Sequence, residues 1–375
     1  MKISRIEITH HQLPLDPPFH PSWSSQPRKI FDATVVRVHT DSGHMGVGSG
    51  DYMLGFGGHE RLFVGQDPMQ LERHNRVIEH ITFHYGRCWP LDLALWDLAG
   101  KIAGQPCWKL LGGLRNRIPC YASSGTLRSA PELADFSERV VARGFGAMKI
   151  RFRRGDWRDD IRALEAVSKR VGDKLELMVD CNQGWRFPWD TQSAWNVKDA
   201  LVIGRELERL GVYWMEEPLH RTDRDGMRRL RDTLDVRIAG GELAREPAEL
   251  RDLITDGCLD VIQPDVVSVG GITGLQKDAH LAAAHDVVFT PHSWGNGIGV
   301  TANAHLYAAT SDRGYFEFPW DAPEWTLERR DFPLAKPLDV DASGHIVLCD
   351  APGLGFELDE DRLAATLVDG GASNN

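Results

Sequence analysis

Apolar runs of strand length alternate with segments of helical periodicity between residues 119 and 317. Helical patterns such as those at 159–171 and 198–210 separate most of these runs. Because eight strand–helix units close into a parallel barrel, this region predicts an α/β fold built on a modified TIM barrel. The eight predicted strands are PCYASSG, GAMKIRF, LELMVDCN, VYWMEE, VRIAGG, LDVIQPD, DVVFTPH and YFEF.

The pattern before the barrel is different, because strands come first and helices follow. The stretches ISRIEITHHQL and DATVVRVHTDSGHMGVGSGDY have strand character, whereas residues 61–111 are mostly helical. This order is typical of an α+β unit. We therefore expect an N-terminal α+β domain at 1–117, a barrel at 118–330 and a C-terminal segment at 331–375 that returns to the first domain.

Composition and charge exclude several classes of protein. The formal net charge of −11 argues against nucleic acid or an anionic membrane surface as a partner. No run approaches the roughly 20 apolar residues of a membrane span, and the amino terminus has no signal-peptide core. The six cysteines form no CxxC pair, so we expect free thiols. These features together predict a cytoplasmic protein.

Five carboxylates and one histidine recur at the ends of the last six predicted strands. Consecutive members are separated by 36, 26, 23, 27 and 25 residues, and one barrel unit fills roughly 25 residues. Residues at that interval gather on one face of a barrel, where acidic groups need a cation to lie close together. The six residues are Asp180, Glu216, Glu242, Asp265, His292 and Glu317.

The natural ligands for a metal ion are Asp180, Glu216 and Glu242. Hard oxygen donors from three strand ends suit Mg²⁺, and the absence of histidine and cysteine from this triplet lowers the case for zinc. A single strand-end carboxylate more often caps a helix or pairs with an arginine, but three on successive strands favour a metal site. Glu217 should face away from the barrel axis or contact the ligands from outside. Asn182 lies two residues beyond Asp180, on the same face, as an outer partner.

The chain resembles the enolase superfamily, and within it the mandelate racemase-like branch. The resemblance covers nearly the whole chain, and the order of its motifs is specific although each motif alone is weak. It implies an α+β capping domain, a (β/α)₇β-barrel, Mg²⁺ on the three carboxylates, and a substrate whose carboxylate lies beside the proton that is removed. The motifs are WDLAGKIAGQPCWKLLGG, KIR, VDCNQ, WMEEP, GGE, QPDVVSVGGITG, PHSW and FEF.

His292 is the predicted base, and Asp265 its partner. They end neighbouring strands, and an aspartate bound to one ring nitrogen sets the tautomer and raises the basicity of the other. Their separation matches the His–Asp dyad of the racemase-like branch. The alternative is a structural histidine beside Pro291.

The second predicted strand carries Lys149 and Arg151 on the same inward face. Racemases of the resembled branch have a second lysine where this chain has Arg151, and arginine cannot accept a proton at ordinary pH. We expect Arg151 to hold a substrate carboxylate or a leaving oxygen, with Lys149 as electrostatic support; a salt-bridged strand is the alternative. A Lys-x-Arg pair resembles sugar-acid dehydratases. Glu317 resembles a residue that donates a hydrogen bond to the substrate carboxylate, which requires it to carry or share a proton.

These features favour a Mg²⁺-dependent dehydratase of a small-molecule sugar acid that yields a 2-keto-3-deoxy acid. A racemase or epimerase needs a second base, for which only Lys149 is available. Cycloisomerases and dipeptide epimerases of the superfamily use a lysine on the sixth strand, and residues 265–267 offer none. The remaining alternative is a non-catalytic barrel, but such a protein would not need the three metal ligands beside a His–Asp pair. We also expect a homo-oligomer, and substrate contacts from loops at 17–28 and 51–58. Candidate contact residues are His20, Trp23, Arg28, Tyr52 and Asn182.

Overall fold

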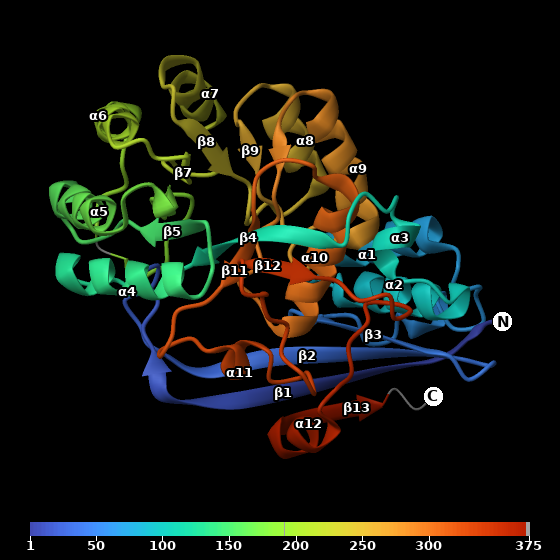
Figure 1. Cartoon of the computed structure of the whole chain (residues 1–375). Coiled ribbons are helices and arrows are strands. Elements are labelled where there is room, and N and C mark those ends of the chain that lie inside the picture. The colour runs from blue at the N-terminus through green and yellow to red at the C-terminus, as the bar shows by residue number, and fades with distance from the viewer. Residues whose placement is uncertain (191, 373–375) are drawn as a thin grey trace.

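A parallel barrel stands beside an antiparallel sheet in the computed structural model, which describes residues 1–190 and 192–372 (Figure 1). The predicted α/β class, with a modified TIM barrel and an N-terminal α+β domain, is confirmed. Among the described residues, no helix combines the length and apolar character that crossing a membrane requires. All six cysteines are described and free.

The barrel sheet contains each of the eight predicted strands, and neighbours along it run parallel. β11 pairs with β4, and Thr290 after β10 donates a hydrogen bond to the carbonyl of Tyr315 before β11, so the curled sheet closes on itself. The strands are β4 (Arg117–Ser123), β5 (Ala147–Arg151), β6 (Glu176–Asp180), β7 (Trp214–Glu216), β8 (Arg237–Gly240), β9 (Val261–Ile262), β10 (Val288–Phe289) and β11 (Phe316–Pro319).

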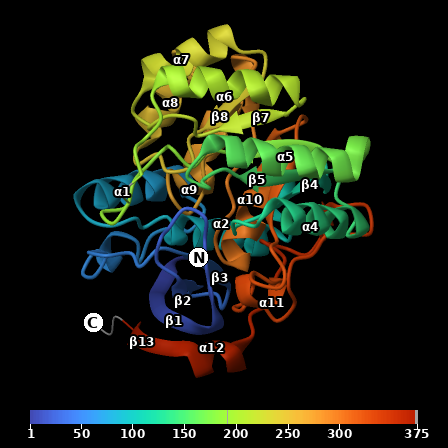
Figure 2. The ribbon, with the colours of Figure 1, turned by 90° about the vertical axis from the view of Figure 1, so that its left-hand side faces the viewer.

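Helices cover the outside of the barrel and pack their apolar faces on it (Figures 1 and 2). Their starts follow sequence signals: Ser129 and Asn196 each begin a helix with a reciprocal side-chain cap, and Asp156 caps another. The barrel helices are α4 (Ala130–Ala142), α5 (Trp157–Val171), α6 (Val197–Arg209), α7 (Arg224–Thr233), α8 (Pro247–Thr255), α9 (Gly271–Ala284) and α10 (Gly297–Thr310).

The barrel interior follows the two-residue period of its strands. Most side chains of an apolar layer precede a polar residue at a strand end by two positions. On β5, for example, Ala147 lies in this layer, and Lys149 and Arg151 follow on the same side of the strand. The layer consists of Tyr121, Ala147, Met178, Trp214, Ala239 and Val261. The strand geometry therefore places polar groups together at the carboxyl end, above an apolar floor.

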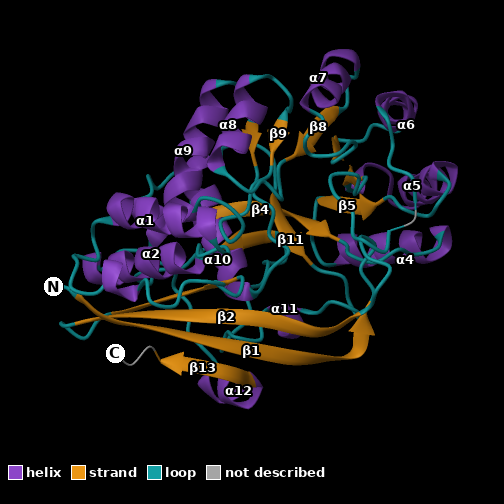
Figure 3. Cartoon of the chain, turned by 180° about the vertical axis from the view of Figure 1, so that it is seen from behind, coloured by secondary structure: helices purple, strands orange, loops and turns teal. Residues whose placement is uncertain are grey.

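The N-terminal sheet has the order β13-β1-β2-β3, with every pair antiparallel. Figure 3 shows its strands β13, β1 and β2 side by side. β3 lies close to α2 because it carries glycines: a Cβ atom at Gly46 or Gly48 would stand 2.1 Å from a backbone oxygen of that helix. The elements are β1 (Ile3–Phe19), β2 (Arg28–Thr40), β3 (Met45–Gly50), the 3₁₀ turn η1 (Glu60–Leu62), α1 (Leu71–His84), α2 (Pro90–Ala103) and α3 (Cys107–Leu110).

The last part of the chain leaves the barrel and reaches the N-terminal sheet. β13 pairs antiparallel with β1, and α12 contacts the same strand (Figure 1). Residues 373–375 of the segment predicted at 331–375 lie outside the described residues. The remaining elements are the 3₁₀ turn η2 (Gly172–Lys174), α11 (Leu327–Arg330), β12 (His345–Val347), α12 (Glu360–Thr366) and β13 (Leu367–Ala372).

Candidate active site

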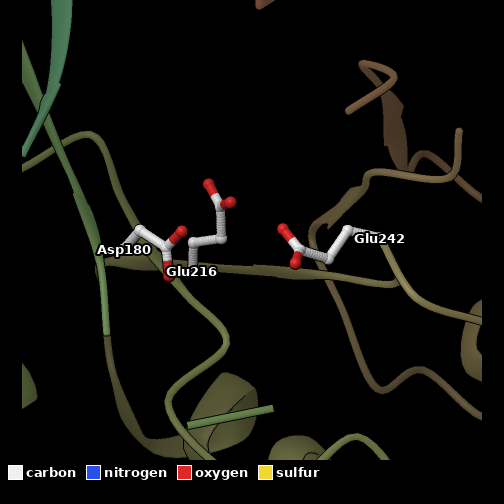
Figure 4. A group of neighbouring side chains, drawn as sticks. All are labelled: Asp180, Glu216 and Glu242. Carbon is white, nitrogen blue, oxygen red and sulfur yellow. The ribbon is translucent and has the colours of Figure 1, made fainter. Parts of the chain in front are cut away.

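Asp180, Glu216 and Glu242 converge at the carboxyl ends of β6, β7 and β8. One carboxylate oxygen from each lies within 4.8 Å of the other two, and Figure 4 shows the side chains extending toward a common space. Asp180 and Glu216 are the last residues of their strands. Glu242 follows Gly241, whose φ of 106° is a conformation that favours glycine. The turn after β8 thus directs the third carboxylate toward the other two.

The three carboxylates are buried and repel one another. Burial raises the pKa of Glu216 and of Glu242, and the charge of Asp180 raises both further, although Lys149 and His292 respectively oppose the shift. A divalent cation would relieve this repulsion, and an all-oxygen donor set suits Mg²⁺. The donor set therefore fits the predicted metal ion, which these three residues could hold.

Lys149 is held at the bottom of the site by carboxylates. Its Nζ atom lies 2.6 Å from Oε1 of Glu216 and 2.8 Å from Oε1 of Glu317, and the side chain is fully buried. Burial opposes its charge, but the two carboxylates outweigh burial and raise its pKa. Arg151 contacts Asp180 and donates from Nε to the carbonyl of Ser124 across 2.7 Å. The two cations of β5 thus balance part of the acidic charge.

His292 and Asp265 lie side by side after β10 and β9. Nδ1 of His292 is 2.9 Å from Oδ2 of Asp265, and Nε2 is 3.7 Å from Oε2 of Glu242. Burial lowers the pKa of His292, but the charges of Glu242, Glu317 and Asp265 outweigh it and raise the pKa to about 9. The imidazole is therefore oriented by one carboxylate, and the surrounding acidic groups favour its protonated form.

Asn303 supports this pair, and sequence reasoning missed it. From the middle of α10, its Nδ2 atom donates to Oδ1 of Asp265 across 2.8 Å and to the carbonyl of His292 across 3.1 Å. Its Oδ1 atom accepts the N–H of Val266. An asparagine inside a largely apolar helix was the available signal, because a buried amide needs partners.

Glu317, on β11, accepts hydrogen bonds from opposite sides. Ser123 donates to Oε1 across 2.7 Å, and the N–H of Ser293 donates to Oε2 across 2.6 Å. Burial raises the pKa of Glu317, but Lys149 and His292 outweigh it and lower the pKa. The expected role of Glu317 as a hydrogen-bond donor needs a proton. In this structure Ser123, the Ser293 N–H and Lys149 all donate to its carboxylate, and the direction of the pKa favours its charged form.

A cavity of about 390 Å³ opens next to the metal ligands. Of the five residues predicted to contact substrate, Trp23, Arg28 and Asn182 line it. His20 is exposed and lies outside the lining, as does Tyr52, whose hydroxyl instead donates to Asp32 across 2.7 Å. The full lining is Trp23, Arg28, Arg151, Asn182, Trp185, Arg186, Phe187, Arg221, Glu242, Leu243, Arg245, His292 and Trp294.

The predicted loops contribute unequally to this cavity. β1 continues to Phe19 and β2 begins at Arg28, so only 20–27 forms the connection, which supplies Trp23. The segment 51–58 supplies no lining residue. Most of the lining comes from loops after the barrel strands. Apart from Asn182, Glu242 and His292, sequence reasoning did not select the residues of these loops, because their side chains carry no spacing pattern.

Glu217 and Asn182 have left-handed backbone, with φ values of 45° and 49°. Glu217 is buried against Gly184, where a Cβ atom would lie 2.1 Å from its Oε1 atom. Burial and the charges of Glu242 and Asp180 raise the pKa of Glu217. The backbone N–H of Asn182 donates to Oδ1 of Asp180 across 2.8 Å. Both residues thus lie against the ligand set rather than within it.

This chain is similar in sequence and in structure to known enzymes. A family model described as enolase C-terminal domain-like matches residues 132–362. An L-talarate/galactarate dehydratase of Salmonella typhimurium is 35% identical, over 79% of this chain and 71% of that protein. Its structure with Mg and L-lyxarohydroxamate superposes with a TM-score of 0.85 at 26% identity, over 99% of this chain and 94% of that one.

Relatives with other activities are also similar. A D-galactarolactone cycloisomerase of Agrobacterium fabrum is 28% identical, over 97% of this chain and 98% of that protein. A racemase from Streptomyces coelicolor, solved with bound magnesium, superposes with a TM-score of 0.82 at 28% identity, over 98% of this chain and 100% of that one. Similarity at this level therefore spans three reaction classes, and the site residues must discriminate among them.

Proposed function

This chain belongs to the enolase superfamily, in its mandelate racemase-like branch, and on that premise we propose that it is a Mg²⁺-dependent dehydratase of a sugar acid. Asp180, Glu216 and Glu242 would hold the ion. When bound, Mg²⁺ supplies Lewis-acid stabilisation for the negative charge that develops on the substrate carboxylate. The remaining chemistry falls to groups of the chain itself.

In this proposal His292 removes the proton next to the substrate carboxylate. Asp265 occupies Nδ1, so Nε2 is the nitrogen that takes the proton. The electron pair of the C–H bond forms an enediolate, and its collapse expels the β-hydroxyl. Protonated His292 returns the proton to the departing oxygen, which leaves as water, and the enol tautomerises to a 2-keto-3-deoxy acid. One residue then serves both proton transfers on one face of the substrate.

One observation favours elimination over racemisation: the β5 cation that lines the cavity is Arg151 rather than a lysine. Arg151 lines the cavity beside the metal ligands, and arginine stays protonated at ordinary pH. Lys149 does not line the cavity and has no exposed surface. Inverting a carbon centre needs a proton acceptor on each face of the substrate. The geometry supports one acceptor, His292, with Arg151 available to bind a carboxylate or a leaving oxygen.

The test is a screen of sugar acids with Mg²⁺-loaded protein, with NMR detection of 2-keto acids and of epimers. The proposal predicts a 2-keto-3-deoxy product from at least one sugar acid, with no epimer of the substrate. Epimer formation without 2-keto acid would instead establish the racemase alternative. If no sugar acid gave product or exchanged its α-proton with D₂O, the proposed function would be rejected.

A further inference from the structure

The cavity beside the metal ligands has a cationic rim. Besides the buried Arg151, four arginines line it, and among the residues that the structure describes Glu242 is the only carboxylate in its lining. They come from four separate segments: the start of β2 and the loops after β6, β7 and β8. These arginines are Arg28, Arg186, Arg221 and Arg245.

The polar and charged residues of the lining differ in how deeply they are buried. Glu242, Asn182 and Arg151 are buried, whereas Arg28, Arg186 and Arg221 are partly buried and Arg245 is exposed. The four arginines therefore lie nearer to solvent than the metal end of the cavity. A ligand that spans the cavity would therefore contact the metal site at its deep end and the four rim arginines at its open end.

Two of the rim arginines have a carboxylate partner. Arg221 lies 2.7 Å from Glu249, and Nε of Arg186 lies 3.8 Å from Asp190. Among the side chains that the structure describes, no carboxylate oxygen lies within 4.0 Å of the guanidinium nitrogens of Arg28 or Arg245, although the backbone N–H of Arg245 donates to Oε1 of Glu249 across 3.4 Å. Two guanidinium groups at one cavity, each without an ion-pair partner among the described residues, are placed to bind an anion.

The surroundings of Arg28 and Arg245 also disfavour their charge. Burial lowers the pKa of Arg28, and repulsion by Arg87, together with burial, lowers that of Arg245. Both remain protonated at ordinary pH. A partly desolvated guanidinium is stabilised when an oxyanion approaches, and its planar donors match a carboxylate or phosphate with two hydrogen bonds.

We infer that the substrate carries a second anionic group, which Arg28 and Arg245 bind at the rim while the reacting carboxylate lies at the metal end. The inference rests on the proposed function and narrows its substrate class to sugar acids with an oxyanion at the far end. That oxyanion is the second carboxylate of a sugar diacid or the phosphate of a phosphorylated sugar acid. A neutral terminal alcohol would leave both arginines without a partner.

Binding to a protein that cannot turn over tests this directly. Isothermal titration of the Mg²⁺-loaded His292→Asn variant would compare galactarate with galactonate, glucarate with gluconate, and each hexonate with its 6-phosphate. For the sugar stereochemistry that the protein prefers, we expect the ligand with an anionic end to bind about 30-fold tighter, or more, than the neutral-ended hexonate. Whichever of the two anions binds tighter identifies the terminal group. Equal or tighter binding of the neutral-ended hexonate in every configuration would overturn the inference.

Substitution then assigns the effect to the two arginines. Arg28→Gln and Arg245→Gln, added to the same variant, should each weaken the anionic-ended ligand about 10-fold or more and leave the hexonate unchanged. Arg229→Gln, on the exposed face of α7, is the matched control and should change neither. Because Arg245 is exposed, its replacement should leave the fold intact, and unaltered selectivity in that variant would refute its role.

The failures of the two proposals can be distinguished. If wild-type protein dehydrates hexonates but not hexarates or phosphohexonates, the second-anion inference fails and the dehydratase proposal stands. If an anionic-ended ligand binds selectively but wild-type protein neither forms 2-keto acid nor exchanges the α-proton, the rim site stands and the dehydratase proposal fails.

Discussion

Nδ1 of His292 lies 2.9 Å from Oδ2 of Asp265, and this contact joins the ends of two neighbouring barrel strands. A neutral imidazole has one donor and one acceptor nitrogen, so the contact leaves Nε2 as the acceptor. The other oxygen of Asp265 accepts hydrogen bonds from Asn303 and from the N–H of Val267. Both oxygens of the Asp265 carboxylate therefore have hydrogen-bond partners. In the ring that it orients, Nε2 is the one nitrogen that can take a proton.

The first prediction concerns Asp265→Asn. An amide no longer selects the productive tautomer or stabilises the protonated ring, so we expect kcat to fall by about 10²- to 10⁴-fold. Mg²⁺ affinity, measured by isothermal titration, should stay within about threefold of wild type because Asp265 is not in the ligand set. Loss of Mg²⁺ binding with an unchanged rate per bound ion would show that the pair is misassigned.

Asn303→Ala tests the support behind that pair. Removing its two donated hydrogen bonds should lower kcat by roughly 10-fold, with KM little changed and the pH–rate profile displaced. Thr301→Ala is the matched control on the same helix, since its hydroxyl donates to the carbonyl of Gly297 one turn earlier and does not contact the dyad. Equal losses in both variants, with unshifted pH profiles, would indicate damage to α10 rather than to the dyad.

Metal dependence is predicted by the converging carboxylates. Chelation should abolish turnover and Mg²⁺ should restore it, while Glu242→Gln should weaken Mg²⁺ binding by about 100-fold or more and remove activity. Glu138→Gln, at an exposed ion pair with Arg170, is the control and should behave as wild type. Full activity of Glu242→Gln in excess chelator would contradict the metal assignment.

We expect a substitution of Asp278, which lies on α9 away from the active site, to stabilise the protein. Its buried Oδ2 atom has no hydrogen-bond partner among the described residues, and burial raises its pKa from 3.8 to about 7. A carboxyl group with a raised folded-state pKa reduces the free energy of unfolding as the pH rises from about 4 through about 7. Asp278→Asn should therefore add about 1–3 kcal/mol to that free energy near pH 8.

The pH dependence checks the cause of this gain. Near pH 4 the native carboxyl is neutral in the folded protein, so the gain from Asp278→Asn in urea unfolding should largely vanish. Asp173→Asn at an exposed turn should have little effect at either pH. A gain of equal size at both pH values would mean that the charge of Asp278 is not the cause.

The sequence predicted those parts of the site that strand geometry determines. Asp180, Glu216 and His292 follow apolar runs whose order places their ends on one barrel face, so spacing alone brought them together. Lys149 and Arg151 shared a face for the same reason, because side chains alternate along a strand.

Residues whose position depends on loop conformation or on packing between distant segments were not predictable in this way. Tyr52 was expected at the substrate but turns toward Asp32, on the N-terminal sheet. Arg245 lines the cavity because of the turn after β8, and Asn303 reaches Asp265 from 38 residues away. Glu317 lies against Lys149, a contact between β11 and β5 that no local pattern encodes.

Exchange of the α-proton in D₂O shows whether His292 is the one base that faces the substrate. The measurement is deuterium incorporation by NMR in Mg²⁺-loaded His292→Asn protein, with both α-configurations of a productive substrate. The exposed His285→Asn serves as the control and should exchange and turn over like wild type. The account predicts that His292→Asn neither exchanges nor forms product with either configuration while Mg²⁺ stays bound. Surviving exchange of one configuration would show a second base on the opposite face, with Lys149 its candidate, and would contradict the one-base dehydratase.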